Sequence, residues 1–489
     1  MSGSKVAKNT AYLITAFIGQ KVLAFVYFTI VARSVGVEGA GRYFLAVSFA
    51  TVFAVFLDLG LTNVLIRETA KRPEDAARLL SATMAVKAVM AGLTVALTNG
   101  LAYLMGYPAE TRIMVGIASL VMVVDALNLA WYGVMRGLQN LKYEAIGVVS
   151  GQAVSLAFGG LFIWLGLPLP WLVVALFLST AWNWIWAYLN LRRLGIRPLA
   201  VSWDRATFRF LWSVTLPFAL AGIFARVYSY IDSVMMSKLA DETAVGLYGV
   251  GYKITFSFQC LAMAFAAAVY PAMSAACAES RERLPGLLTM SLKYLTLIAA
   301  PIVIGIFVLA EPLIVAIYGP EFFGAVRPLQ VLIFSLIFAF LYWPVGSLLN
   351  AADRQAENTA VMGATMVLNV GLNAWLIPAL GAAGASWASV AGNCLLFFGA
   401  LIVSARMVAP LESAKIIGFS WRILSAAAVM GLAVAFLEPF LPLLALIAVG
   451  AVAYVSAVFA LRAMTWAEAQ ALVSVMLRRG RGVSDIASV

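Results

Sequence analysis

Histidine is absent from this chain of 489 residues, and only 11% of its residues are charged. Soluble domains carry roughly 25% charged residues because their surfaces face water, so this composition places most of the surface in lipid. Cysteine is also sparse. The three cysteines, Cys260, Cys277 and Cys394, lie far apart and form no motif with metal-ligand spacing. Zinc, haem and thiol-relay chemistry are therefore not expected, and we predict neither a metal nor a cofactor.

Apolar residues, by contrast, make up 63% of the chain. A membrane helix needs roughly 20 mainly apolar residues, and about fourteen stretches meet that requirement. They lie near 10–32, 43–65, 79–104, 112–134, 144–166, 170–191, 210–237, 245–268, 291–310, 329–350, 358–377, 385–405, 419–437 and 441–462. The sequence therefore predicts an all-α polytopic membrane protein with about fourteen transmembrane helices.

Basic residues indicate the orientation of these spans. With the N-terminus in the cytoplasm, 24 of the 33 lysines and arginines fall on the inside and five fall on the outside. Cytoplasmic loops carry the excess of basic residues, so both termini are predicted to be cytoplasmic. The net charge of +11 then reflects topology and attraction to anionic membrane lipid, and it does not indicate nucleic-acid binding.

The connections between the spans are short, the longest lying near 192–209 and 311–327. None is long enough to fold as a catalytic domain, which disfavours a membrane-embedded glycosyltransferase or polymerase. The tail near 465–482 mixes apolar residues with Arg478, Arg479 and Arg481. That pattern suits an amphipathic helix on the inner membrane surface, with an unstructured tail as the alternative.

An internal repeat is visible at an offset of 205 residues. Gly41 and Tyr43 open the second predicted span, and Gly246 and Tyr248 open the eighth after a similar short acidic loop. Six spans separate the two motifs, an even number, so the halves would be parallel repeats. We therefore expect an N-terminal lobe at 1–205, a C-terminal lobe at 206–410, and two extra spans with a cytoplasmic tail at 411–489.

The same offset relates two cations within the spans, Lys21 and Arg226. Charges in the bilayer are costly and usually face a bundle interior or a wet cavity. Neither cation has an acid three or four residues away, and Asp125 is the remaining acid at mid-depth. A net-positive cavity suits a phosphate or pyrophosphate group, so we predict that Lys21 and Arg226 bind substrate. The alternative is structural pairing with Asp125 or with helix carbonyls.

Four other charges within spans lie at matching depths, and each has a candidate partner. Asp58 in the second span and Lys87 in the third are predicted to form one pair, and Asp232 and Lys253 a second. Structural pairing is favoured over a direct substrate role for these four. Asp125, or Asp58 if it does not pair with Lys87, is the candidate for ion coupling, because a chain without histidine relies mainly on carboxylates to carry protons.

Several stretches resemble the polysaccharide-transporter (Wzx-type) flippases of the multidrug/oligosaccharidyl-lipid/polysaccharide (MOP) exporter superfamily. They recur in order over almost the whole chain and are Asp58-Leu-Gly-Leu-Thr-Asn, Tyr230-Ile-Asp232-Ser with Ala244-Val-Gly-Leu-Tyr248, Tyr318-Gly-Pro-Glu-Phe-Phe, and Leu368-Asn369-Val-Gly-Leu-Asn373. The resemblance implies two six-helix lobes around a central cavity, with two further C-terminal helices. It also implies alternating access in the cell membrane of a prokaryote, and no enzyme activity.

The resemblance further implies the cargo, a lipid-linked oligosaccharide carried from the inner to the outer leaflet for O-antigen, capsule or exopolysaccharide assembly. An H+ or Na+ gradient would drive the cycle, and the polysaccharide polymerase or ligase machinery would be a partner. Two other branches of the superfamily remain as alternatives. Drug exporters select cations and would show a net acidic cavity, whereas lipid II flippases share the cationic cavity and are disfavoured only by the quoted motifs.

Overall fold

The computed structural model describes residues 3–196, 205–468 and 470, and within them side chains are described from residue 12 onward, apart from 13, 14 and 205–219. Every regular element in this part of the chain is helical, as predicted. Among the described residues, twelve candidate membrane spans are long and apolar enough to cross a bilayer. The chain forms two compact units, Met1–Gly249 and Val250–Val489.

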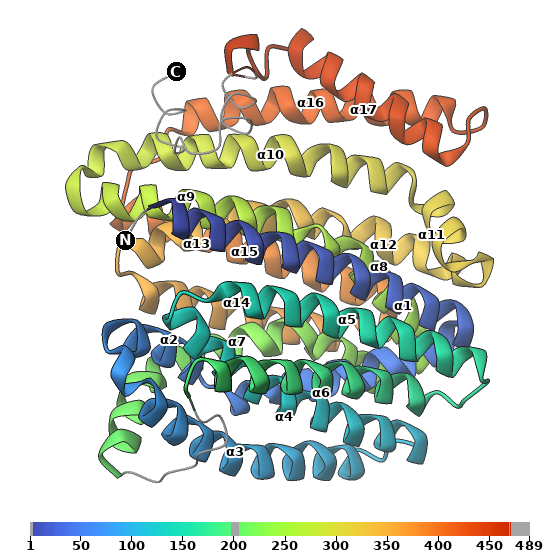
Figure 1. Ribbon diagram of the computed structural model, residues 1–489. Helices are drawn as coiled ribbons and strands as arrows, with labels where there is room; N and C mark the ends of the chain where they lie inside the picture. Colours follow the sequence, from blue (N-terminus) through green and yellow to red (C-terminus); the bar gives the residue numbers. More distant parts are fainter. Residues whose placement is uncertain (1–2, 197–204, 469, 471–489) are drawn as a thin grey trace. The chain divides into compact units, whose positions relative to one another are not determined.

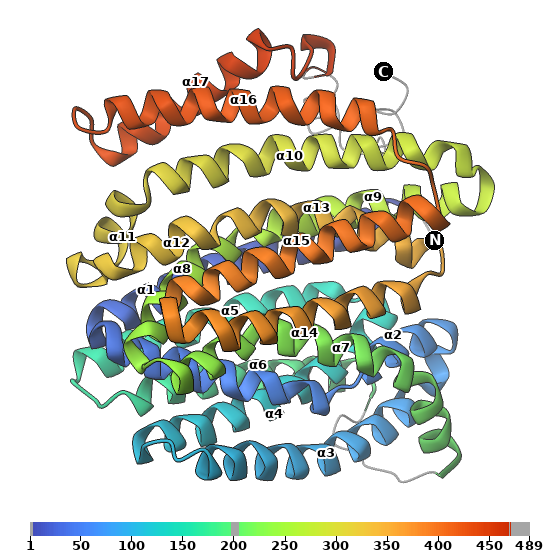
Figure 2. The same ribbon diagram turned by 180° about the vertical axis from the view of Figure 1, so that it is seen from behind.

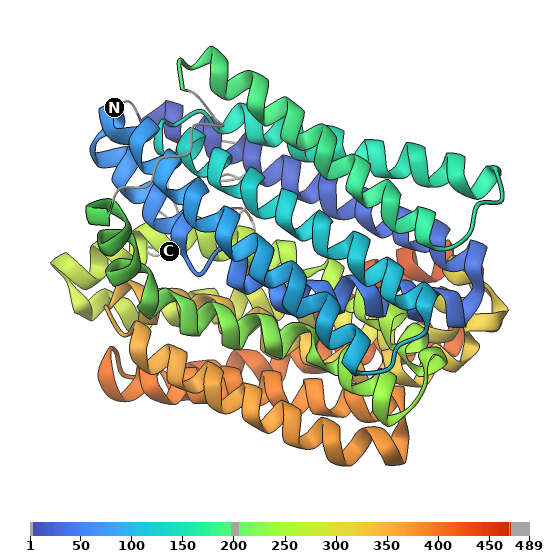
Figure 3. The same ribbon diagram turned by 90° about the horizontal axis from the view of Figure 1, so that it is seen from below.

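Unit 1 holds the first seven α-helices and the beginning of the eighth (Figure 1). They are α1 (Gly3–Phe53), α2 (Leu61–Lys71), α3 (Ala76–Leu104), α4 (Ala109–Gly137), α5 (Leu141–Trp164), α6 (Pro170–Arg193), α7 (Arg205–Leu239) and α8 (Glu242–Ser257), with 3-10 turns at Ala54–Leu57 and Pro73–Asp75. Figure 3 shows α4, α5 and α6 running side by side.

The first two predicted spans are joined without a loop. Thr15–Leu57 is one candidate span of 43 residues, about twice the length a bilayer needs. It bends at Gly36, whose φ of 70° lies in the left-handed region that glycine adopts readily. One long helical element therefore supplies two predicted crossings, so the twelve elements do not by themselves fix the number of crossings.

The second predicted span, 43–65, is also interrupted. The α-helix ends at Phe53, a 3-10 turn follows, and Leu59 and Gly60 adopt positive φ angles of 45° and 88° before α2 begins. Asp58 lies in this break. Non-helical backbone within a membrane segment is tolerated only where it is buried in protein or lines a cavity. The break therefore marks Asp58 as a residue whose surroundings need to be described.

Small residues at every fourth position of α5 allow close packing in unit 1. Gly147, Gly151, Ser155 and Gly159 are all buried on one face. A Cβ at Gly159 would lie 2.2 Å from the ring of Tyr27 in α1, and Ser179 in α6 donates a hydrogen bond of 2.6 Å to the Gly151 carbonyl. This small-xxx-small pattern brings the backbones of membrane helices together.

Unit 2 contains the rest of the chain, seen from behind in Figure 2. Its elements after α8 are α9 (Gln259–Glu279), α10 (Leu284–Val308), α11 (Ala310–Tyr318), α12 (Val326–Leu332), α13 (Phe334–Ala351), α14 (Gln355–Leu380), α15 (Ala382–Met407), α16 (Ser413–Leu437) and α17 (Leu443–Ala460), with 3-10 turns at Arg281–Arg283 and Pro320–Ala325. The last two helices pack on α10, where Tyr454 of α17 donates a 2.9 Å hydrogen bond to the Leu297 carbonyl.

Candidate functional site

The two predicted substrate cations lie on α1 and α7 of unit 1, and both side chains are exposed. Arg226 is the charged group that acts electrostatically on the Asp125 carboxyl of α4. Helix α1 as a whole packs against both α4 and α7. Near Lys21 its neighbour is α5, where an added Cβ at Gly19 would lie 3.9 Å from Val149. No hydrogen bond or ion pair joins Lys21 to another group in the described part of the chain.

The break at Asp58 is held by Lys87 of α3. Lys87 Nζ lies 2.5 Å from Asp58 Oδ1 and donates a second hydrogen bond of 2.9 Å to the Ala126 carbonyl. Its side chain is 1% exposed, whereas that of Asp58 is 27% exposed. Thr62 also donates to Asp58. Because Ala126 adjoins Asp125, this network fixes the backbone of the helical turn that carries the mid-depth acid.

The second predicted pair involves both units. Asp232 in unit 1 is 3% exposed and accepts a hydrogen bond of 2.7 Å from the hydroxyl of Tyr248. Lys253 is half-buried in the part of α8 that belongs to unit 2. The pairing of Asp232 with Lys253 stays a prediction.

A cluster that the sequence did not reveal lies at the end of unit 1 predicted to face outward. Arg42 makes ion pairs with three glutamates: Glu38 one turn away, Glu110 at 3.0 Å and Glu242 at 2.5 Å. These acids come from α1, the first turn of α4 and the first turn of α8. Only the spacing of Glu38 and Arg42, four residues apart, was visible in the sequence.

The glycines of the sequence repeat meet beside this cluster. A Cβ at Gly41 would lie 1.9 Å from the Glu242 carbonyl oxygen, and one at Gly246 would lie 2.1 Å from the Val37 carbonyl oxygen. Val37 and Glu242 are themselves 205 residues apart, so the two contacts are related by the repeat. The same offset relates Arg33 on α1 to Lys238 on α7. This reciprocal packing supports the offset that makes Lys21 and Arg226 equivalent.

The donor set offers little to a metal ion. Within the described residues, no group of three or more His, Cys, Asp or Glu side chains has a geometry that would hold one. The charged groups described so far in unit 1 are two exposed cations, one carboxylate near Arg226, a buried lysine with its partner, and the Arg42 cluster.

Comparison with known structures defines the class of protein. The fold matches that of the lipid II flippase MurJ in an inward closed conformation, with a TM-score of 0.75 and 14% identity over 91% of this chain and 97% of that one. It also matches an inward-facing multidrug resistance MATE transporter of the MOP superfamily, with a TM-score of 0.67 and 16% identity over 84% and 98% of the two chains. The fold is that of a MOP-superfamily transporter.

Two family models match the sequence. The family described as "Polysaccharide biosynthesis protein" matches residues 6–277, more than half of the chain, and the MatE family matches residues 217–375. The chain belongs to the polysaccharide biosynthesis protein family. The predicted family is confirmed.

A curated relative gives a more specific comparison. The succinoglycan biosynthesis transport protein ExoT of Rhizobium meliloti (strain 1021) is 23% identical over 331 residues. The match covers 66% of this chain and 64% of that protein, so it spans less than two thirds of the relative's length.

Proposed function

We propose that the protein is a flippase that carries a polyprenyl-pyrophosphate-linked oligosaccharide from the cytoplasmic to the outer leaflet for assembly of a cell-surface polysaccharide. Membership of the family and the name of the ExoT relative, a succinoglycan biosynthesis transport protein, support this cargo class. The observation that carries the proposal is the pair of repeat-equivalent, exposed cations, Lys21 and Arg226, on adjoining helices of unit 1.

The chemistry of a pyrophosphate accounts for both cations. Guanidinium binds phosphate oxygens through parallel hydrogen bonds, whereas an ammonium acts as a point charge, so Arg226 orients the group and Lys21 neutralises it. Asp125 lies within electrostatic range of Arg226. The pyrophosphate then replaces the carboxylate as the partner of Arg226, while the glycan occupies water and the prenyl chain stays in lipid.

The location and the coupling complete the proposal. We place the protein in the cell membrane of a prokaryote with both termini in the cytoplasm, because basic residues concentrate on that side. Alternating access is driven by an H+ or Na+ gradient acting through Asp125, whose carboxyl is released as Arg226 takes up cargo. Contact with the polymerase or ligase that uses the cargo is part of the same proposal.

Leaflet accessibility of a fluorescent polyprenyl-pyrophosphate oligosaccharide in proteoliposomes tests this function. We expect rapid translocation by the unmodified protein and a loss of about tenfold or more in a Lys21→Ala/Arg226→Ala variant, because two charge-assisted contacts disappear. The matched control is Arg33→Ala/Lys238→Ala, which removes the same charges from the same helices at another repeat-related position.

Two results would contradict the proposal. Full translocation by the Lys21→Ala/Arg226→Ala variant would remove the cations from the substrate site, and no translocation of several lipid-linked glycans under imposed gradients would remove the cargo class. Lipid II is the second cargo to offer in the same assay, because the fold matches a lipid II flippase along 97% of that chain.

A further inference from the structure

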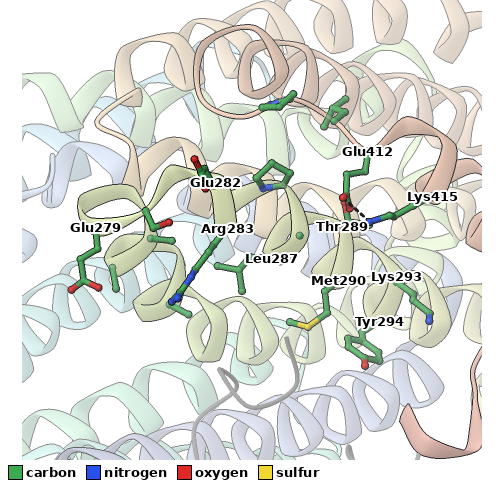
Figure 4. A pocket seen from close by; sticks show the side chains of 18 of the residues that line it. Glu279, Glu282, Arg283, Leu287, Thr289, Met290, Lys293, Tyr294, Glu412 and Lys415 are labelled. Atoms are coloured by element: carbon green, nitrogen blue, oxygen red, sulfur yellow. Dashed lines mark hydrogen bonds and ion pairs between the residues drawn. The ribbon is translucent and has the colours of Figure 1, made fainter. Parts of the chain in front are cut away.

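Unit 2 contains a cavity of about 970 Å³ that the transport site does not use (Figure 4). Its wall is formed by the end of α9, the start of α10, the link from α15 to α16, and the segment after α17. Ala272, Leu287, Met290 and Leu411 contribute apolar surface. A volume of this size accommodates several side chains of a bound segment.

The charges in the wall leave an excess of acid. Lys415 donates a 2.7 Å hydrogen bond to Glu412, and this bond, helped by Thr289, holds the pKa of Glu412 below its usual range. Figure 4 shows this pair at one side of the cavity. Three further charged residues of the wall, Glu279, Glu282 and Arg283, are exposed and have no ion pair among the described residues. We call this group the rim.

A fourth acid, Glu468, ties the C-terminal segment to the wall. Its carboxylate lies 2.6 Å from Lys293 Nζ of α10 and accepts a 2.9 Å hydrogen bond from the Thr465 backbone N–H, while its own N–H donates to the Thr465 hydroxyl. Burial raises the pKa of Glu468, but the Lys293 contact outweighs it and the pKa is lowered. This reciprocal capping box starts a helical turn at the cavity itself.

The sequence that leaves this anchor is complementary to the cavity. Residues 471–489 contain three arginines and one acid, and apolar residues precede the arginines. The wall contains four acids, Glu279, Glu282, Glu412 and Glu468, against three cations, Arg283, Lys293 and Lys415. A cationic, amphipathic occupant therefore gains both charge pairing and apolar burial there.

We propose that the cavity is the docking site of the chain's own C-terminal segment, residues 471–489, with Arg478 and Arg479 at the Glu279 and Glu282 rim. Ten residues of chain span roughly 17 Å on average, enough to cross a cavity whose volume of about 970 Å³ corresponds to a sphere about 12 Å across. An anionic lipid headgroup is a poorer occupant, because Glu279 and Glu282 of the rim would repel it. The docked segment would contact residues of α9, α10 and α16, none of which belongs to the proposed cargo site. The test of docking therefore does not depend on the proposed function.

Cross-linking in the full-length protein tests the contact. In a background with Cys260, Cys277 and Cys394 replaced by alanine, Gly286→Cys marks the cavity wall and Leu477→Cys marks the segment. Gly286 lines the cavity and has no atom within 4 Å of an added Cβ. Gly418→Cys is the matched control, because it is equally open but lies outside the wall. A short bis-maleimide should link Leu477→Cys to Gly286→Cys about tenfold more than to Gly418→Cys, because a docked segment has a high effective concentration.

Charge reversal separates docking from chance proximity. Glu279→Lys/Glu282→Lys should reduce the Gly286 cross-link several-fold, and adding Arg478→Glu/Arg479→Glu should restore it, while thermal unfolding confirms that each variant is folded. Equal cross-linking at Gly286 and Gly418 would overturn the proposal. So would a Gly286 cross-link that is unaffected by charge reversal, or co-purification of anionic lipid that protects Gly286→Cys from labelling after deletion of residues 471–489.

Discussion

At the scale of single residues, the most constrained charge in the described chain is Lys87. Its ammonium is 1% exposed and rests on one carboxylate, Asp58, and one carbonyl, that of Ala126. Removing one partner of a buried pair leaves an uncompensated charge, which costs far more than the pair itself contributes. The two partners are not equivalent, because Asp58 is 27% exposed and regains water more easily.

This asymmetry gives a prediction for stability. Asp58→Asn, which strands the buried ammonium, should lower the free energy of unfolding by about 3 kcal/mol or more, and Lys87→Met should lower it by less. The Asp58→Asn/Lys87→Met double variant should cost less than the sum of the single changes. Denaturant unfolding of the purified protein in detergent measures all three.

The matched control is Lys415→Met, which breaks the exposed pair with Glu412. Its lysine side chain is 70% exposed, so the effect should stay within about 0.5 kcal/mol. An Asp58→Asn effect no larger than this control would mean that Lys87 finds another partner. It would also contradict the inference that the Asp58–Lys87 pair fixes the helical turn that carries Asp125.

At the scale of helices, glycine decides how closely α1 and α8 approach. Gly41 and Gly246 each lie against the backbone of the other helix, and Arg42 joins the same helix ends to α4 through Glu110 and Glu242. Small residues allow this approach, and the ion pairs hold it. In the proposed cycle these contacts close the outer end of unit 1 and must separate when cargo leaves.

Substitution of these glycines should separate the helices. Gly41→Ala and Gly246→Ala place a Cβ 1.9 Å and 2.1 Å from backbone oxygens that cannot rotate away, so each should cost about 1–3 kcal/mol of stability. Gly92→Ala on α3 is the control, because a Cβ there meets nothing within 4 Å. Thermal unfolding of the three variants is the measurement, and equal midpoints would show that α1 and α8 are not held together in this way.

At the scale of the whole molecule, the chain is a multi-pass membrane protein of the polysaccharide biosynthesis protein family. The energy source of the proposed transport is the main functional prediction. Asp125→Asn removes the carboxylate that interacts with Arg226. The variant should lose the acceleration of translocation by a proton or sodium gradient while still binding cargo through its cations. The assay compares proteoliposomes with and without each imposed gradient.

A control and a contrary outcome sharpen that experiment. Asp75→Asn, whose carboxylate is in an exposed pair with Arg78, should keep the full gradient dependence. Translocation by the unmodified protein that is unchanged when both gradients collapse would remove ion coupling. Loss of cargo binding in Asp125→Asn would assign the acid to the substrate site.

Composition and local pattern determined the class of this protein. The chain has 11% charged residues and apolar stretches of bilayer length. These features predict an all-α membrane fold, because a helix satisfies its backbone hydrogen bonds within each span. The repeat offset was equally readable, since Gly41 and Gly246 sit in similar short motifs. The lobes at 1–205, 206–410 and 411–489 remain predictions based on that repeat.

Tertiary structure alone decided which distant charges meet. Arg42 binds acids 68 and 200 residues away, and Lys87 binds a carbonyl 39 residues away. No periodicity encodes such proximity, because it depends on how whole helices pack. The break at Asp58 and the acidic cavity beside Glu468 have the same origin: both arise where several elements converge, and the sequence describes only one element at a time.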